Sequence, residues 1–125
     1  INPGATGGTA KRWFPERYAE VCINIAGKTS LGQAFALIEK CSLFITNDSG
    51  LMHAAAALNI NQLAVIGSTD YIATAPSNKN SIMVRAKVPC SPCLKDICPT
   101  NHKCMDKISV DMVMETCKSL LKDSW

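Results

Sequence analysis

The chain has 125 residues, of which 47% are hydrophobic, 18% are charged and 6% are aromatic, and its formal net charge is +3. This composition predicts one soluble globular domain with a modest core. No apolar run approaches the roughly 18 residues that a membrane-spanning helix needs, and we find no basic, apolar leader. The charge is mild and evenly spread, which argues against a nucleic-acid-binding surface. Because the sequence opens on Ile1 instead of methionine, we expect a piece of a longer protein.

The hydrophobic pattern predicts strands separated by single helices. The predicted strands are residues 22–26, 43–46, 63–66 and 82–85, and the predicted helices are one near Pro15 and residues 31–40, 51–58 and 109–122. Thr29 or Ser30 is placed to cap the second of these helices. This order indicates βαβ units in a Rossmann-like α/β fold with a mostly parallel sheet. In such sheets, ligands bind at the carboxyl ends of the strands.

The sharpest motif is TNDSGLMH, from Thr46 to His53. A predicted buried strand ends here, and a helix starts after the turn formed by Asp48, Ser49 and Gly50. Backbone N–H groups at the start of a helix attract anions, and the helix dipole strengthens the attraction. We therefore expect a phosphate or diphosphate here, with His53 facing the same site. The alternative is that Asp48 or Ser49 only caps the helix and that His53 is an interior histidine.

A second candidate is the glycine-rich segment PGATGGTAKRW at residues 3–13. It offers two threonine hydroxyls and the cations of Lys11 and Arg12 to an anion. It is not a phosphate-binding P-loop, because Ala10 precedes the lysine and Arg12 stands where serine or threonine is required. It also lacks the G-x-G of dinucleotide sites. A surface loop without a ligand is the alternative.

Seven cysteines are an unusual number for this length. Four lie close together in the sequence: Cys90, Cys93, Cys98 and Cys104. An odd total argues against a secreted disulfide framework. A C-x-x-C pair can form one edge of a metal site, but the rest of the spacing is too tight for an ordinary zinc ribbon. We expect a compact structural hairpin over residues 89–105, with a metal or redox site as the alternative. The other three have apolar neighbours and are expected to be buried: Cys22, Cys41 and Cys117.

Three segments, in this order, resemble glycosyltransferase family 9, the heptosyltransferases: PGATGGTAKRWFPERYAEV, AGKTSL and TNDSGLMHAAAALN. The loop at residues 67–77 also resembles the family, with Tyr71 where proline is usual. The resemblance implies that residues 1–125 are an incomplete C-terminal, nucleotide-sugar-binding domain of a GT-B enzyme, in which two Rossmann-like domains enclose the active site. It implies inverting transfer of heptose from ADP-L-glycero-D-manno-heptose to the lipopolysaccharide inner core. It further implies no cofactor or metal, a cytoplasmic location at the inner membrane with peripheral membrane contact, and a monomer at full length.

The resemblance also implies a set of donor-binding residues: Thr6, Lys11, Thr29, Asp48, Ser49, Gly50 and His53. The diphosphate and sugar would be lined by Asp48, Ser49, Gly50 and His53. Phosphate or heptose would be contacted by Thr6 and Lys11, and Thr29 would lie beside the nucleoside. No catalytic residue is expected in this chain, because the general base of the family is an aspartate of the N-terminal domain.

One departure from the family pattern falls between Val21 and Cys22. Relatives continue there with a further strand, a loop and a helix. We expect residues that are missing from the resolved chain and not a true deletion, because a deletion would remove a central strand. Two other functions stay open from the sequence: a non-catalytic nucleotide-binding module and a cysteine-based metal or redox module.

Overall fold

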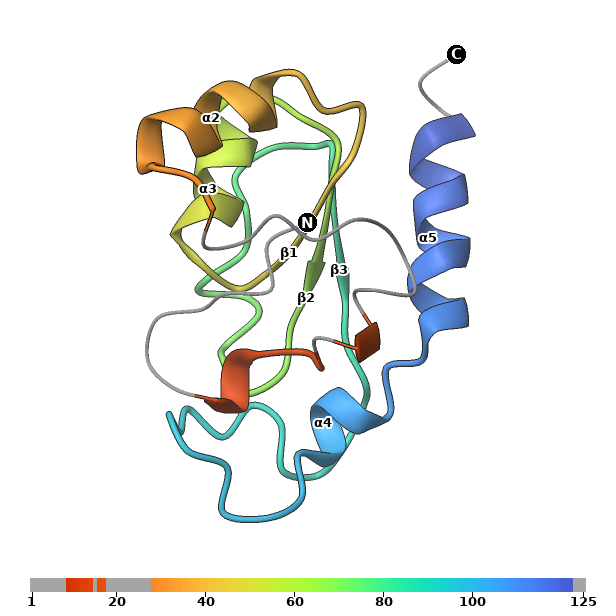
Figure 1. The fold of residues 1–125 in the computed structure, drawn as a ribbon. Helices are drawn as coiled ribbons and strands as arrows, with labels where there is room; N and C mark the ends of the chain where they lie inside the picture. The colour runs from red at the N-terminus through yellow and green to blue at the C-terminus, as the bar shows by residue number, and fades with distance from the viewer. Residues whose placement is uncertain (1–8, 15, 18–27, 123–125) are drawn as a thin grey trace.

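The computed structural model describes residues 9–14, 16–17 and 28–122. Its centre is a sheet of three parallel strands in the order β1 (Phe44–Asn47), β2 (Gln62–Val65) and β3 (Ser81–Val84) (Figure 1). The helices are η1 (Thr9–Lys11), α2 (Leu31–Glu39), α3 (Gly50–Ala57), α4 (Lys103–Asp106) and α5 (Val110–Lys122), where η1 is a 3-10 turn. None of the described helices is long and apolar enough to cross a membrane. Two sequence predictions lie outside the described residues: the strand at 22–26 and the helix start at Pro15.

The carboxyl ends of the three strands lie in register. Asn47 pairs with Val65, and Val65 pairs with Val84. Each of the three later predicted strands is confirmed, with a shift of one residue. The loops that follow the strands therefore leave the sheet at one edge, where parallel α/β proteins bind ligands. Figure 1 shows η1, α4 and the loop before α4 gathered at this same end.

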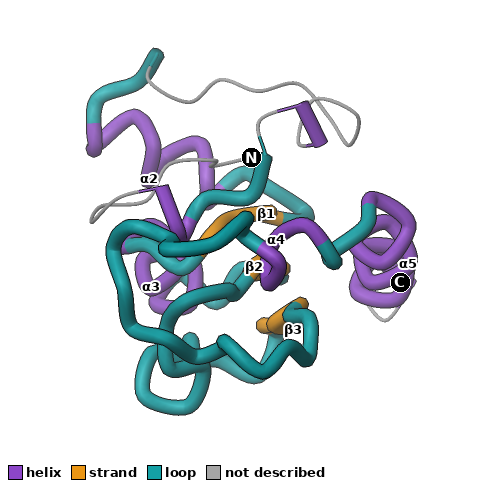
Figure 2. The backbone as a smooth tube through the Cα atoms, turned by 90° about the horizontal axis from the view of Figure 1, so that it is seen from below, coloured by secondary structure: helices purple, strands orange, loops and turns teal. Residues whose placement is uncertain are grey.

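Helices cover both faces of the sheet, as Figure 2 shows, with α3 and α2 on one side and α5 on the other. Alternate residues of β2 point to opposite faces, so Leu63 packs in a cluster with Val113 of α5, while Ala64 packs with Met52 of α3. All four side chains are buried completely. Burial of each large apolar side chain contributes about 1.5–3 kcal/mol, and burial on both faces explains why residues 63–66 form a continuous apolar run.

The structure adds two details to the predicted helices: which residue caps the start of α2 and which leucine α5 buries. Ser30, and not Thr29, caps α2: its hydroxyl accepts from the N–H of Gln33 at 3.3 Å, and the Gln33 side chain accepts from the Ser30 N–H at 2.9 Å. This reciprocal capping box satisfies two backbone donors. On α5 the hydrophobic spacing of Val113 and Cys117 predicts that Leu121 is buried, but Leu120 is buried instead and Leu121 is 37% exposed. Both leucines follow the buried Cys117 at helical spacing, three and four residues later, so the spacing alone does not distinguish them.

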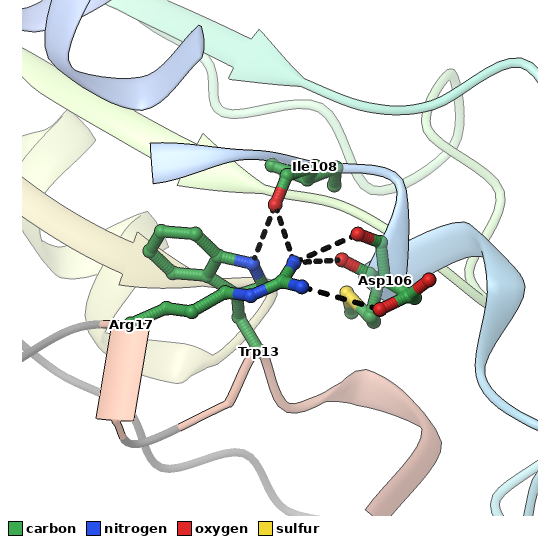
Figure 3. Close-up of polar contacts among 5 residues, drawn as sticks. Trp13, Arg17, Asp106 and Ile108 are labelled. Atoms are coloured by element: carbon green, nitrogen blue, oxygen red, sulfur yellow. Dashed lines mark hydrogen bonds and ion pairs between the residues drawn. The ribbon is translucent and has the colours of Figure 1, made fainter. Parts of the chain in front are cut away.

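The N-terminal segment is fastened to the residues around α4 by two side chains, Trp13 and Arg17 (Figure 3). The buried Trp13 indole N–H donates to the carbonyl of Ile108 at 3.1 Å. The Arg17 guanidinium donates to the same carbonyl and to that of Asp106, both at 2.8 Å. A cation on the carbonyls that end a helix satisfies groups that have no partner within the helix. Arg17 therefore caps α4 from a distant part of the sequence.

We predict that Arg17→Met lowers the free energy of unfolding by about 1–2 kcal/mol, because it removes Nη1, which donates to the carbonyls of both Asp106 and Ile108. Urea denaturation measures this change. The control is Asp106→Asn, which removes the 3.2 Å ion pair to Arg17 but keeps the carbonyls. Because the Asp106 side chain is 64% exposed, this control should cost less than about 0.5 kcal/mol. Equal losses in the two variants would show that the ion pair, and not the carbonyl bonds, stabilises the contact.

Candidate functional site

The junction between β1 and α3 holds the main predicted motif. Asn47 is buried at the end of the strand, Asp48 and Ser49 are half-buried, and the helix begins at the exposed Gly50. Ser49 occupies the capping position, but its side chain makes no capping hydrogen bond. Its hydroxyl lies 3.3 Å from that of Thr46 instead. Ser49 therefore does not act as a side-chain cap, contrary to the capping alternative.

The start of α3 is open to a ligand. A Cβ atom placed on Gly50 would meet nothing within 4 Å, so the glycine leaves space beside the backbone. His53, one turn later, is exposed, and the alternative of an interior histidine is wrong. An exposed helix start without a side-chain cap can bind an anion through its N–H groups.

Asp48 is held by the loop that follows β2. The Thr74 hydroxyl lies 3.1 Å from Oδ2 of Asp48 and 2.9 Å from the carbonyl of Asp70. One hydroxyl proton is shared between these two acceptors. The Asp70 carboxylate in turn accepts from the N–H groups of Ile72 and Ala73 at 2.9 and 3.3 Å, which fixes the turn that carries Thr74. Thr74 does not stand out in the sequence, where its one signal is the family-like loop at residues 67–77.

The segment that carries Lys11 reaches the same end of the sheet. The backbone N–H of Trp13 donates to Oδ1 of the buried Asn47 at 3.2 Å, and the N–H of Ala10 donates to the carbonyl of Asp96 at 3.3 Å. Lys11 lies between these two anchors and is half-buried. Asn47 is thus a positioning residue that the sequence argument missed, because its partner is 34 residues away.

The described contacts do not bear on two predicted donor-binding residues, Thr6 and Thr29. Thr6 lies outside the described residues. Thr29 is half-buried just before α2, and no hydrogen bond joins it to the β1–α3 junction in the described part of the chain. Their roles stay predictions.

The four clustered cysteines line one pocket of about 250 Å³, together with residues that include Ser68 and Lys95. The N–H groups of Cys93 and Leu94 both donate to the Ser68 carbonyl, at 3.1 and 2.7 Å, and hold the loop against the end of β2. All cysteines among the described residues are free thiols. Within those same ranges, no group of three or more His, Cys, Asp or Glu side chains is arranged to hold a metal ion.

Individual thiols differ in environment. A hydrogen bond with the Thr100 side chain lowers the pKa of Cys98, whereas burial, followed by the nearby thiols of the cluster, raises the pKa of Cys104. Away from the cluster, Cys117 is buried as predicted, but Cys41 is only partly buried because it lies just past the end of α2. Cys22 lies outside the described residues.

We predict that iodoacetamide modifies Cys98 well before Cys104 at pH 8, because the thiolate is the nucleophile and a lower pKa increases its fraction. Mass spectrometry of digested samples over a time course measures both rates. Thr100→Val should slow the reaction of Cys98 and leave that of Cys104 unchanged. Faster modification of Cys104 would contradict the assignment.

The amino-acid sequence of this chain is similar to those of one protein family. The family model "Glycosyltransferase family 9 (heptosyltransferase)" matches residues 19–104. Lipooligosaccharide heptosyltransferase 2 of Campylobacter jejuni subsp. jejuni serotype O:2 is 32% identical over 162 aligned residues, which cover 99% of this chain and 51% of that protein. Lipopolysaccharide heptosyltransferase 2 of Escherichia coli K12 is 31% identical, over 95% of this chain and 45% of that protein.

A solved structure of the E. coli ADP-heptose lipopolysaccharide heptosyltransferase II superposes with a TM-score of 0.82 at 29% identity, covering 98% of this chain and 46% of that one. The chain thus spans about half the length of these relatives. The expectation of unresolved residues at the Val21–Cys22 junction is wrong, since the sequence is continuous there. The predicted Rossmann-like half of a GT-B enzyme is confirmed, and the chain belongs to glycosyltransferase family 9, the heptosyltransferases.

Proposed function

We propose that this chain is the donor-binding half of an inverting heptosyltransferase, which transfers heptose from ADP-L-glycero-D-manno-heptose to the lipopolysaccharide inner core. The observation that carries the proposal is the junction of β1 and α3, where a buried strand ends at an open helix start without a side-chain cap. Membership of the heptosyltransferase family supports the same assignment.

In this proposal the diphosphate of the donor lies at the start of α3. The N–H groups around Gly50 and the cation of Lys11 stabilise the negative charge that grows on ADP as it leaves. Ser49 belongs to the same proposed set, and the exposed His53 lies one turn along the same helix. Thr6 and Thr29 complete the proposed set, on phosphate or heptose and beside the nucleoside, respectively.

Asp48 suits the sugar better than the phosphates. A carboxylate repels a diphosphate, but it accepts hydrogen bonds from sugar hydroxyls. Thr74 occupies Oδ2 of Asp48 in the structure, which leaves Oδ1 for such a hydroxyl. We therefore assign Asp48 to heptose recognition and Thr74 to holding it in place.

The remaining parts of the reaction lie beyond this chain. An inverting transfer needs a base that activates the acceptor hydroxyl, and we assign it to the other half of the enzyme. We further propose that the enzyme needs no cofactor or bound metal, works as a monomer and meets its lipid-linked acceptor at the cytoplasmic face of the inner membrane.

We predict that Gly50→Ala weakens ADP binding by at least tenfold, about 1.4 kcal/mol, because its methyl group would occupy the space that the diphosphate needs. Stability should stay equal or rise by up to about 1 kcal/mol, since alanine favours a helix and meets no neighbour. Gly32→Ala on α2, which also meets nothing within 4 Å, is the matched control. Titration calorimetry with ADP measures affinity. Unchanged ADP affinity in Gly50→Ala would rule out the helix start as the diphosphate site.

We predict that Thr74→Val raises the KM for the nucleotide sugar by about tenfold in the full-length enzyme, because Asp48 loses the hydroxyl that orients it. Thr74→Ser keeps that hydroxyl and should restore the parental KM. ADP affinity should change much less, since Asp48 faces the sugar. Thr116→Val is the control, because among the residues that the structure describes its hydroxyl bonds only the Met112 carbonyl on α5, at 2.8 Å. A parental KM in Thr74→Val would remove the assigned role.

A further inference from the structure

The four clustered cysteines surround a pocket that the proposed donor site does not use. The Cys90 thiol is exposed, those of Cys93 and Cys98 are partly buried, and that of Cys104 is buried. All four are free in the structure. The pocket, of about 250 Å³, is several times larger than a water molecule, so it admits a small reactant such as a peroxide. The cluster therefore holds reduced sulfur that a reactant from solvent can reach.

Cys98 and Cys104 differ as a reactive thiol differs from its partner. The Cys98 sulfur lies 3.5 Å from the Thr100 hydroxyl, and this hydrogen bond lowers the pKa of the thiol. Accessible thiols of low pKa are the ones that react with peroxides. Burial, followed by the charges of the other three thiols, raises the pKa of Cys104, so all three lie near it. Cys104 is thus the common neighbour with which an oxidised Cys98 can react.

The pocket shares two segments with the proposed donor site. At the end of β2, the Cys104 sulfur lies 3.2 Å from the point where a Cβ atom on Gly67 would stand, and the loop that starts there holds Asp48 in place. In the N-terminal segment, Ala10 lines the pocket and directly precedes Lys11. Figure 1 shows the loop before α4 beside η1. Because the sulfurs are not bonded in the structure, an S–S bond requires this loop, or α4 itself, to move against both segments.

We propose that Cys98 is a site of oxidation by hydroperoxides, that Cys104 converts the product to a disulfide, and that this disulfide weakens donor binding. The Cys98 thiolate attacks one oxygen of the peroxide, the O–O bond breaks, and the other oxygen leaves with a proton as water or an alcohol. Cys98 is then a sulfenic acid. The Cys104 sulfur displaces its hydroxyl group, which leaves with the Cys104 proton as water while the S–S bond forms. Two thiols are oxidised and the peroxide is reduced.

Hydrogen peroxide followed by trypsin tests the oxidation, because lysines separate the reacting thiols. Cys98 lies on the peptide 96–103 and Cys104 on the peptide 104–107, while the other two pocket thiols share the peptide 88–95. After alkylation of the remaining thiols, mass spectrometry should find the first two peptides joined, in a chain that stays monomeric on a non-reducing gel. A bond from either of them to the peptide 88–95 instead, or a disulfide between two chains, would overturn the proposal.

Three variants test the order of the steps. Cys98→Ser should slow the loss of the Cys104 thiol at least about tenfold. Cys104→Ala should stop the reaction at the sulfenic acid of Cys98, which dimedone traps. Cys41→Ser is the matched control, since it removes a partly buried thiol outside the pocket and should leave the rate unchanged. An unchanged rate in Cys98→Ser would overturn the proposal, and this comparison decides it if Cys104→Ala does not fold.

Titration calorimetry with ADP tests the effect on the donor site, which rests on the proposed function. The oxidised chain should bind ADP at least about fivefold more weakly than the reduced chain, and dithiothreitol should restore the affinity. Peroxide-treated Cys98→Ser should keep the reduced affinity. Equal affinities of the reduced and oxidised chains would overturn the link to the donor site. If the reduced chain does not bind ADP, the proposed function and this link fail together, while mass spectrometry still decides the oxidation.

Discussion

The arrangement of the site depends on the buried amide of Asn47. Its Oδ1 accepts the backbone N–H of Trp13 at 3.2 Å, at the position where β1 ends. A buried amide without partners costs roughly 1–3 kcal/mol, so this contact fixes the N-terminal segment against the sheet. The indole of Trp13 continues the connection to Ile108. Trp13 thereby links the end of the glycine-rich segment to β1 and to the residues before α5.

The helices before and after β1 start differently, and the difference is informative about function. Helix α2 satisfies its own start through the reciprocal bonds of Ser30 and Gln33. Helix α3 has Ser49 at the equivalent position but no side-chain cap. Serine is among the best capping residues, so its failure to cap is a local departure from the most stable arrangement. Departures from the locally preferred arrangement concentrate at functional sites.

The sequence predicted most of the sheet and the main part of the candidate site, because both are encoded locally. Apolar runs and turn residues specify the strands to within one residue, and the motif around Asp48 and Gly50 is continuous in the chain. The contacts of Asn47, Arg17 and Thr74 join residues 26 to 91 positions apart, and no pattern in one sequence gives such pairs.

The proposed donor site contains both groups that attract anions and a carboxylate that repels them. The cation of Lys11 and the N–H groups of α3 attract phosphate, while the carboxylate of Asp48, fixed by Thr74, repels it and accepts from hydroxyls. A nucleoside diphosphate sugar carries anionic oxygens at one end of its diphosphate–sugar unit and neutral hydroxyls at the other. Only one direction of binding satisfies both groups. The same few residues would therefore fix the donor's orientation as well as its position, which a transfer at a single anomeric carbon requires.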